Sequence, residues 1–229
     1  MTELKIAPCD IRAARFAVMN WHYSKAVPAG KLVKFGVWEN GKFIGAVIYG
    51  RGATPNLGRP YGLEQTEICE LVRVALDKHV TPVSQIVSET LRQLRQSNPG
   101  LRLVVSFADP DQGHSGGIYK AGNWLFTGTS APAKFFRIYG KKTHPRSVGA
   151  MGGIQSIEWV RANVDPNAEI ILTQGKLRYL YPLDKQMRRV ISKIALPYES
   201  AVEGLKVSHG DSVPEVPVQL QPTALGGVA

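Results

Sequence analysis

The sequence predicts an α/β fold in which a mixed, mostly antiparallel sheet is flanked by helices. Apolar, β-prone runs joined by an Asn-Gly pair come first, and helical and strand patterns alternate after them. The chain has 229 residues, of which 44% are hydrophobic, so it can bury one sizeable core. No apolar run approaches the roughly 20 residues of a membrane-spanning helix, and we therefore expect a soluble protein.

The first part of the chain predicts a strand, a helix and a hairpin. Residues 4–7 form a short β-prone run, and Asp10 can cap a helix over residues 11–21 whose apolar side chains share one face. Residues 32–38 and 42–49 are apolar, β-prone runs separated by Asn-Gly. Because Asn and Gly tolerate the positive φ values of a tight turn, the two runs predict a β-hairpin.

The middle of the chain alternates between strands and helices. Residues 68–76 predict a largely buried strand after a loop rich in Gly and Pro. Thr81-Pro82 supplies an N-cap and a proline at the first position of a helix that ends at Asn98-Pro99-Gly100. The elements expected next are a strand over residues 101–107, a short helix over 115–121 and a strand over 124–129.

The last third of the chain is less regular. An amphipathic helix is expected over residues 153–163, and Asp184 can cap a final helix. The strands expected here cover residues 135–139, 170–172 and 176–181.

Positive charge is concentrated in this last third. The chain carries 28 Lys and Arg against 18 Asp and Glu, a net charge of +10. Residues 131–190 alone hold eleven Lys or Arg against four acidic residues, a local excess of +7. Such a balance favours a polyanionic partner, most often nucleic acid. We expect one domain over residues 1–200 with a basic insertion at 131–173, followed by a disordered tail at 201–229.

Cysteine usage and the start of the chain predict a reducing compartment. Cys9 and Cys69 can form at most one disulfide and lack the paired spacing of a zinc site. The first residues show no basic stretch followed by an apolar one, so no secretory signal is expected. We expect the protein in the cytoplasm.

Five short motifs, taken in order, resemble the Mom family of phage DNA-modification proteins, within the GCN5-related N-acyltransferase (GNAT) superfamily. The resemblance covers roughly residues 4–185. The motifs are Trp21-His22-Tyr23-Ser24, Glu70-Leu71-Val72-Arg73, Ser106-Phe107-Ala108-Asp109, the run from His114 to Trp124, and Lys176-Leu177-Arg178-Tyr179.

The resemblance implies a GNAT-like catalytic domain and a DNA adenine-modifying transferase. Such an enzyme converts adenine in phage DNA to N6-carbamoylmethyladenine, or to a related N6-acyl-type adduct, and protects the phage genome from restriction in the host cytoplasm. The implied partners are double-stranded DNA with a flipped adenine and a small-molecule group donor. Iron and acetyl-CoA are the cofactors implied.

One segment departs from the superfamily's pattern for binding CoA. The pyrophosphate usually lies on a Gln/Arg-x-x-Gly-x-Gly/Ala loop, whose backbone N–H groups bind phosphate at a helix N-terminus. The corresponding residues 77–84 contain no glycine, and Pro82 lacks an N–H group. Lys78 and the helix dipole remain as attractions for an anion.

The candidate catalytic residues are those that could activate or hold an adenine amine. Asp109 follows a buried strand, at the end where open α/β sheets bind ligands. The structural alternative is that Asp109 only caps a helix or turn. His22 and Tyr23 follow the first helix, and the alternative for His22 is an ordinary surface or core histidine. Ser115 and Tyr119 start a short helix, and Tyr119 matches the superfamily tyrosine that protonates a leaving thiolate. Its alternative is a core aromatic.

Further candidates concern the cofactors. His22, Asp109 and His114 would provide two histidines and one carboxylate, the ligand set that suits non-haem iron(II). Arg73, in the middle of an apolar strand, would bind an anionic cofactor, together with Lys78 and Ser115. The alternative for Arg73 is an ion pair with Glu70 or Glu67.

The basic insertion is the candidate DNA-binding region. Cationic side chains bind phosphates without reading sequence, and aromatic rings can stack on an extruded base. The alternative is an ordinary solvated basic face. The candidate DNA-binding residues are Lys141, Lys142, His144, Arg146, Gln155, Arg161 and Arg178.

Two other functions stay open on the sequence. One is a CoA-dependent N-acetyltransferase that acts on a small amine or a protein; the missing glycines and the basic insertion count against it. The other is a nonenzymatic DNA-binding protein, which would not require the polar residues His22, Tyr23, Asp109, Ser115 and Tyr119.

Overall fold

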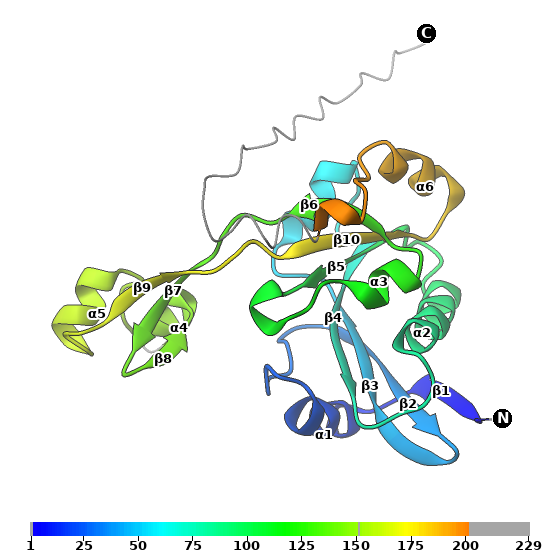
Figure 1. The fold of residues 1–229 in the computed structure, drawn as a ribbon, viewed down its shortest axis with the longest axis horizontal. Coiled ribbons are helices and arrows are strands. Elements are labelled where there is room, and N and C mark those ends of the chain that lie inside the picture. Colours follow the sequence, from blue (N-terminus) through cyan, green and yellow to red (C-terminus); the bar gives the residue numbers. More distant parts are fainter. Residues whose placement is uncertain (1, 151, 202–229) are drawn as a thin grey trace, which may run out of the picture. The chain divides into compact units, whose positions relative to one another are not determined.

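The computed structural model describes residues 2–150 and 152–201, and it confirms the expected mixed, mostly antiparallel sheet flanked by helices (Figure 1). The chain divides into two compact units. The main unit contains Met1–Phe107, Gly116–Gly128 and the described residues from Arg178 onward, and the second unit contains Ala108–Ser115 and Thr129–Leu177. None of the helices in the described residues is long and apolar enough to span a membrane.

The strands are β1 (Leu4–Pro8), β2 (Leu32–Glu39), β3 (Lys42–Gly50), β4 (Ile68–Leu76), β5 (Leu103–Ala108), β6 (Leu125–Thr129), β7 (Lys134–Ile138), β8 (Lys141–Thr143), β9 (Glu169–Leu172) and β10 (Leu177–Pro182). The α-helices are α1 (Ile11–Trp21), α2 (Val83–Ser97), α3 (Gly117–Ala121), α4 (Pro145–Ala150), α5 (Ile157–Asn163) and α6 (Lys185–Ser192), with 3₁₀ turns η1 (Pro55–Tyr61) and η2 (Pro110–Gln112).

The main unit is built on a seven-stranded sheet in the order β1-β2-β3-β4-β5-β10-β6. The expected β2–β3 hairpin is confirmed, with Asn40 and Gly41 at φ values of 50° and 76°, the positive values of a type I′ turn. β1 to β4 pair antiparallel, whereas β4 and β5 pair parallel.

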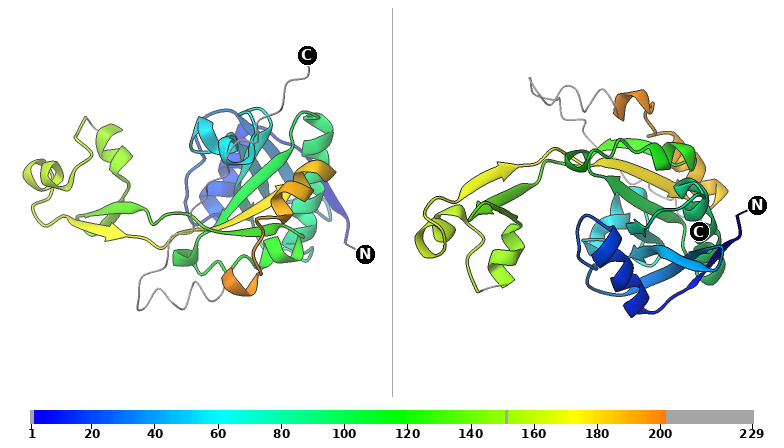
Figure 2. Two further views of the ribbon diagram at one scale, coloured as in Figure 1. Left: turned by 90° about the horizontal axis from the view of Figure 1, so that it is seen from above. Right: turned by 60° about the horizontal axis from the view of Figure 1, so that its bottom comes forward.

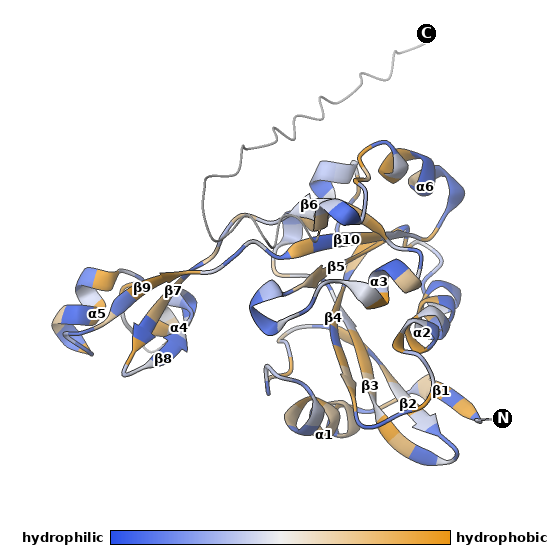
Figure 3. Cartoon of the chain, viewed as in Figure 1, coloured by the Kyte–Doolittle hydropathy of each residue, from blue (hydrophilic) through white to orange (hydrophobic). Residues whose placement is uncertain are grey.

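Helices cover both faces of this sheet (Figure 2). Ala14 and Val18 of α1 pack on Ile48 of β3, and Met187 of α6 packs in the cluster that contains Val105 of β5. The next residue along each strand faces the other way: Tyr49 bonds Thr90 of α2, and Ser106 bonds Tyr119 of α3. Figure 3 shows the hydrophobic residues gathered on the strands between these helices.

β4 and β5 part halfway along their length. Their ladder ends at Glu70 opposite Val105, while the rest of β4 pairs only with β3. Just past this point the Ser106 hydroxyl donates to the Leu71 carbonyl at 2.9 Å and lies 2.8 Å from the Tyr119 hydroxyl. A side chain therefore joins the two strands where the backbone ladder stops.

The second unit has its own sheet and core. β7 lies between β8 and β9 in a three-stranded antiparallel sheet. Phe136 and Ile138 of β7 pack with Val148 of α4 and with Ile157 and Val160 of α5. Residues 131–173, the expected insertion, lie within this unit.

Several expected element boundaries were wrong. α2 begins at Val83 and Pro82 is its N-cap, without a side-chain cap bond, because the Thr81 hydroxyl donates to Glu39 instead. The helix expected over 153–163 begins at Ile157, because Ser156 caps it. The helix expected from residue 115 begins at Gly117, after a left-handed Gly116.

Two further elements, β8 and α4, were not anticipated from the sequence. The expected disordered tail, residues 201–229, lies outside the described residues except for Ala201.

The Ser106 bridge predicts unequal costs for two substitutions. Ser106→Ala removes a partner from both the Leu71 carbonyl and the buried Tyr119 hydroxyl, and should lower the free energy of unfolding by about 1–3 kcal/mol. Tyr119→Phe leaves the Ser106–Leu71 bond in place and should cost less. Urea denaturation measures both, with the exposed Ser88→Ala as control. A cost for Tyr119→Phe equal to or above that for Ser106→Ala would contradict the bridge.

Candidate functional site

The end of α1 carries two of the candidate residues, and both are held locally. The His22 N–H closes α1 on Val18, and its ring stacks on Tyr23 with the centroids 4.4 Å apart. The Ser24 backbone N–H donates to Nδ1 of His22 at 3.1 Å. Because a backbone amide can only donate, Nδ1 is an acceptor, and the proton of the neutral imidazole lies on Nε2.

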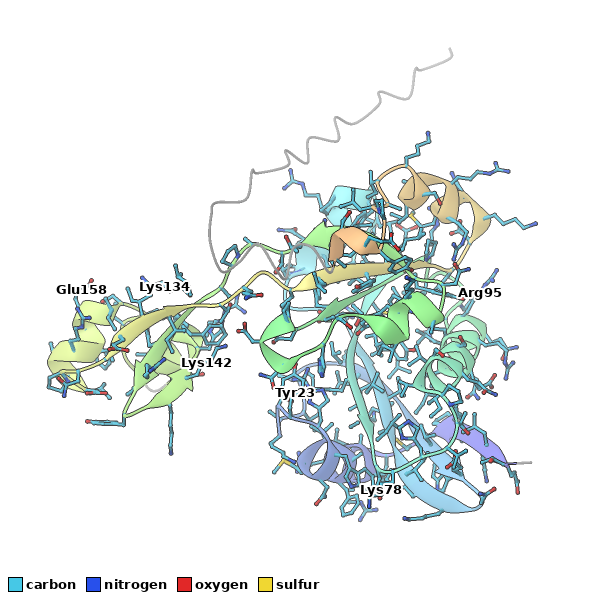
Figure 4. All side chains as sticks on the ribbon, in the orientation of Figure 1. Tyr23, Lys78, Arg95, Lys134, Lys142 and Glu158 are labelled. Atoms are coloured by element: carbon cyan, nitrogen blue, oxygen red, sulfur yellow. The ribbon has the colours of Figure 1, made fainter. Side chains whose placement is uncertain are left out.

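Arg73 attaches the segment after α1 to strand β4. Its guanidinium donates to the carbonyls of Ala26 at 3.2 Å and Val72 at 2.6 Å. Burial lowers the pKa of Arg73, while the nearby Tyr23 and Glu70 act in the opposite direction. Glu67, one alternative partner, lies 3.9 Å from Arg102. Tyr23, labelled in Figure 4, is 48% exposed.

Tyr119 is a buried aromatic residue whose hydroxyl is hydrogen-bonded to Ser106. It stacks on Tyr179 at 4.6 Å, and burial raises its pKa to about 12. Ser106 has one proton, which it donates to the Leu71 carbonyl. The Tyr119 hydroxyl must therefore donate to Ser106. The structure thus places Tyr119 in the core, as in the alternative that the sequence left open.

A second cluster lies in the second unit, in the turn that follows β5. Asp109 caps η2: its Oδ1 accepts from the Asp111 N–H at 3.2 Å. Its Oδ2 lies 3.1 Å from Nζ of Lys176, and the carboxylate side chain is only 16% exposed. Both oxygens of Asp109 are therefore held in a fixed orientation, with lone pairs left over for another donor.

Lys176 is itself fixed in place by Ser130. The Lys176 N–H donates to the Ser130 hydroxyl at 2.9 Å, and the Ser130 N–H donates to the Lys176 carbonyl at 2.8 Å. A Cβ on the preceding residue, Gly175, would lie 2.1 Å from the Ser130 carbonyl oxygen. Glycine at this position permits the close approach that directs Lys176 to Asp109.

The described residues give no support for the expected iron site. His22 belongs to the main unit, and Asp109 and His114 belong to the second. Across residues 2–150 and 152–201, no group of three His, Cys, Asp or Glu side chains could hold a metal ion. Of the expected ligands, Asp109 engages Lys176, and Nδ1 of His22 accepts from the Ser24 N–H.

The segment expected to bind a pyrophosphate is already occupied by a carboxylate of the chain. Glu39, at the end of β2, accepts from the N–H groups of Val80 and Thr81 at 2.9 and 2.8 Å and from the Thr81 hydroxyl at 2.7 Å. Pro82 has no N–H group. Lys78 is exposed on the same segment (Figure 4). A pyrophosphate would meet a negative charge where it needs donors, so these residues do not fit it.

Most of the expected DNA-binding residues are exposed in the second unit. Lys141, Lys142, His144, Arg146 and Gln155 are exposed on or beside β8, α4 and α5.

Two other expected DNA-binding residues have partners within their own unit. Arg161 donates to the Ala168 carbonyl at 2.9 Å, and Arg178 donates to the hydroxyl and carbonyl of Thr127 in the main unit. Ser115 is exposed in the second unit, outside α3.

Four residues with a part in these sites were not assigned a role from the sequence: Glu39, Ser106, Asp111 and Lys176. Ser106 and Lys176 lie in motifs that carried the family resemblance, which is the one signal that could have drawn attention to them. No sequence signal pointed to Glu39 or Asp111, because their partners Thr81 and Lys142 are distant in sequence.

Glu39 predicts a pH-dependent contribution to stability. Its hydrogen bonds to Thr81 and Val80 lower its pKa below the ordinary value of 4.5. A lowered carboxyl pKa adds stability above the unfolded-state value, and this stability is lost as pH falls through the folded-state value. Glu39→Gln should therefore destabilise the protein at pH 7, and the difference from the wild type should shrink in acid. Urea denaturation across pH measures this; a difference independent of pH, or one shared by the exposed Glu64→Gln, would contradict it.

Comparisons with known proteins place these residues in a family. The chain is 28% identical over 193 residues to the methylcarbamoylase Mom of Escherichia phage Mu, covering 82% of this chain and 78% of the relative. Among solved structures it is similar to an N-acyl amino acid synthase from uncultured soil microbes, with 12% identity, 82% and 94% coverage and a TM-score of 0.46. A further one is a putative acetyltransferase from Acinetobacter baylyi, with 12% identity, 80% and 94% coverage and a TM-score of 0.43.

The sequence model of the Mom protein family matches residues 3–200, most of the chain. The chain therefore belongs to the Mom protein family.

Proposed function

We propose that this protein is a phage DNA-modification enzyme that transfers a carbamoylmethyl or related group to the exocyclic amine of adenine in DNA. We further propose that it acts in the host cytoplasm and shields phage DNA from restriction. The observation that carries the proposal is membership of the Mom family, together with the similarity to a relative named as a methylcarbamoylase over 82% of the chain.

Asp109 is the group we assign to proton removal. The amine of adenine is delocalised into the ring and is a poor nucleophile, so it needs a base as its new bond forms. As the nitrogen bonds to the donor's carbon, its proton passes to the Asp109 carboxylate and the leaving group departs with the electron pair. Lys176 and the Asp111 N–H hold the carboxylate oxygens during this step.

The stacked rings of His22 and Tyr23 offer a surface for an extruded base. A base taken out of the duplex is held by stacking on aromatic side chains. Tyr23 is half-exposed, and Arg73 fixes the segment that follows it. In the same unit the Tyr119 hydroxyl donates to Ser106 and supports the sheet.

Mass spectrometry of nucleosides tests the proposal. The protein is expressed with a resident plasmid, and the plasmid DNA is digested to nucleosides. We expect a deoxyadenosine that carries an added carbamoylmethyl-type group. Asp109→Asn should lower its yield by about 10²–10⁴-fold, the usual contribution of a general base, while the exposed Glu158→Gln should not. Unmodified adenine with the folded wild type would refute the function; an active Asp109→Asn variant would refute only the role of Asp109.

Salt-dependent binding tests the DNA contact of the second unit. Arg146 is exposed on α4. If it contacts a phosphate, Arg146→Ala should weaken duplex binding and flatten the slope of log affinity against log salt by about 0.9. Fluorescence anisotropy over a salt series measures both. Arg189, exposed on α6 of the main unit, is the matched control. An unchanged slope for Arg146→Ala would contradict this contact.

A further inference from the structure

One face of the second unit's sheet carries an unusual pairing of cations and carboxylates. Phe136 and Ile138 of β7 point into the core with α4 and α5. Since side chains alternate along a strand, Phe135 and Arg137 lie on the opposite face. We call this the outer face.

The register between strands brings more charge to the outer face. Arg137 of β7 is paired directly with Lys142 of β8 on one side and with Glu169 of β9 on the other. Residues paired directly across neighbouring strands lie on the same face of a sheet. The outer face therefore holds two adjacent cations and an aromatic ring in the middle of the sheet.

Each of the two cations is engaged by a carboxylate. Nζ of Lys142 lies 3.1 Å from Oδ2 of Asp111, and Arg137 lies 3.9 Å from Glu169. Nζ of Lys142 also lies 4.8 Å from the centre of the Phe135 ring. The ring and Asp111 together keep the Lys142 ammonium on the outer face, although 43% of its side chain is exposed.

Such a pair is easily exchanged for a phosphate. Carboxylate and phosphate oxygens accept the same charge-assisted hydrogen bonds from an ammonium group. Ion pairs between exposed side chains add little net stability, because solvent screens them. A duplex supplies a phosphate wherever its backbone passes, and each contact releases condensed counterions.

We propose that the outer face of the β8-β7-β9 sheet, around Phe135, Arg137 and Lys142, binds the DNA phosphodiester backbone, and that Asp111 occupies Lys142 until a phosphate replaces it. The inference rests on the proposed function, since it takes DNA as the partner. It adds which face of the sheet binds and which carboxylate competes.

The exchange leaves Asp109 in place. Lys176, not Lys142, engages the Asp109 carboxylate, and the Asp111 contact to Asp109 comes from its backbone N–H. When the Asp111 side chain releases Lys142, neither of these contacts needs to break. Lys142 can therefore leave Asp111 for a phosphate while Lys176 stays with Asp109.

Duplex binding by a set of four variants tests the exchange. Asp111→Asn removes the competing charge, so the protein should bind a duplex two- to five-fold more tightly at low salt. Lys142→Ala should weaken binding and flatten the salt slope by about 0.9. In the double variant Asp111→Asn with Lys142→Ala, the gain should vanish. Glu158→Gln is the matched control: it removes one negative charge from α5 of the same unit, away from β8 (Figure 4).

Three results would overturn the inference, and they are distinguishable from failure of the proposed function. Binding by Asp111→Asn no tighter than by Glu158→Gln would overturn it. A gain that persists without Lys142 would do the same. Either result, with modified adenine still made by the wild type, leaves the proposed function intact. The inference is also overturned if the wild-type protein binds duplex without any salt dependence. The proposed function is overturned if DNA from cells that express the wild-type protein contains no modified adenine.

Discussion

Two lysines engage the two carboxylates of one short turn, and the chemistry proposed for the second unit depends on this pairing. Asp109 and Asp111 are two residues apart, so their like charges oppose any structure that keeps them together. Lys176 and Lys142 offset this repulsion from two different places in the chain, β10's start and β8. Each carboxylate of the turn therefore has a lysine beside it.

Two hydrogen-bonded clusters stabilise the main unit, one around Ser106 and one around Glu39. Where β4 leaves β5, Ser106 supplies the bond that the backbone ladder no longer makes, and Tyr119 donates to it. Where a cofactor phosphate would need donors before α2, Glu39 has taken them. Both contacts stabilise the main unit, because each satisfies buried hydrogen-bonding groups.

Local signals in the sequence were sufficient to predict much of the fold, but they predicted few of the contacts in the candidate sites. Asp10 and Asp184 cap their helices as expected, and Asn40-Gly41 makes the expected hairpin, because each signal acts within a few residues. The Thr81 cap was wrong because Glu39, far away in sequence, competes for its hydroxyl. Contacts such as Lys176 with Asp109 join distant segments, and no periodicity or motif spacing encodes them.

DNA that takes Lys142 from Asp111 should shield this lysine from solvent reagents, and lysine labelling measures the shielding directly. The protein is treated with an amine-reactive ester with and without saturating duplex DNA, and the labelling rate of each lysine is read by peptide mass spectrometry. The account predicts that duplex slows labelling of Lys142 several-fold and leaves Lys120, which pairs with Glu199 in the main unit, unchanged. Equal labelling of Lys142 with and without bound duplex would contradict it.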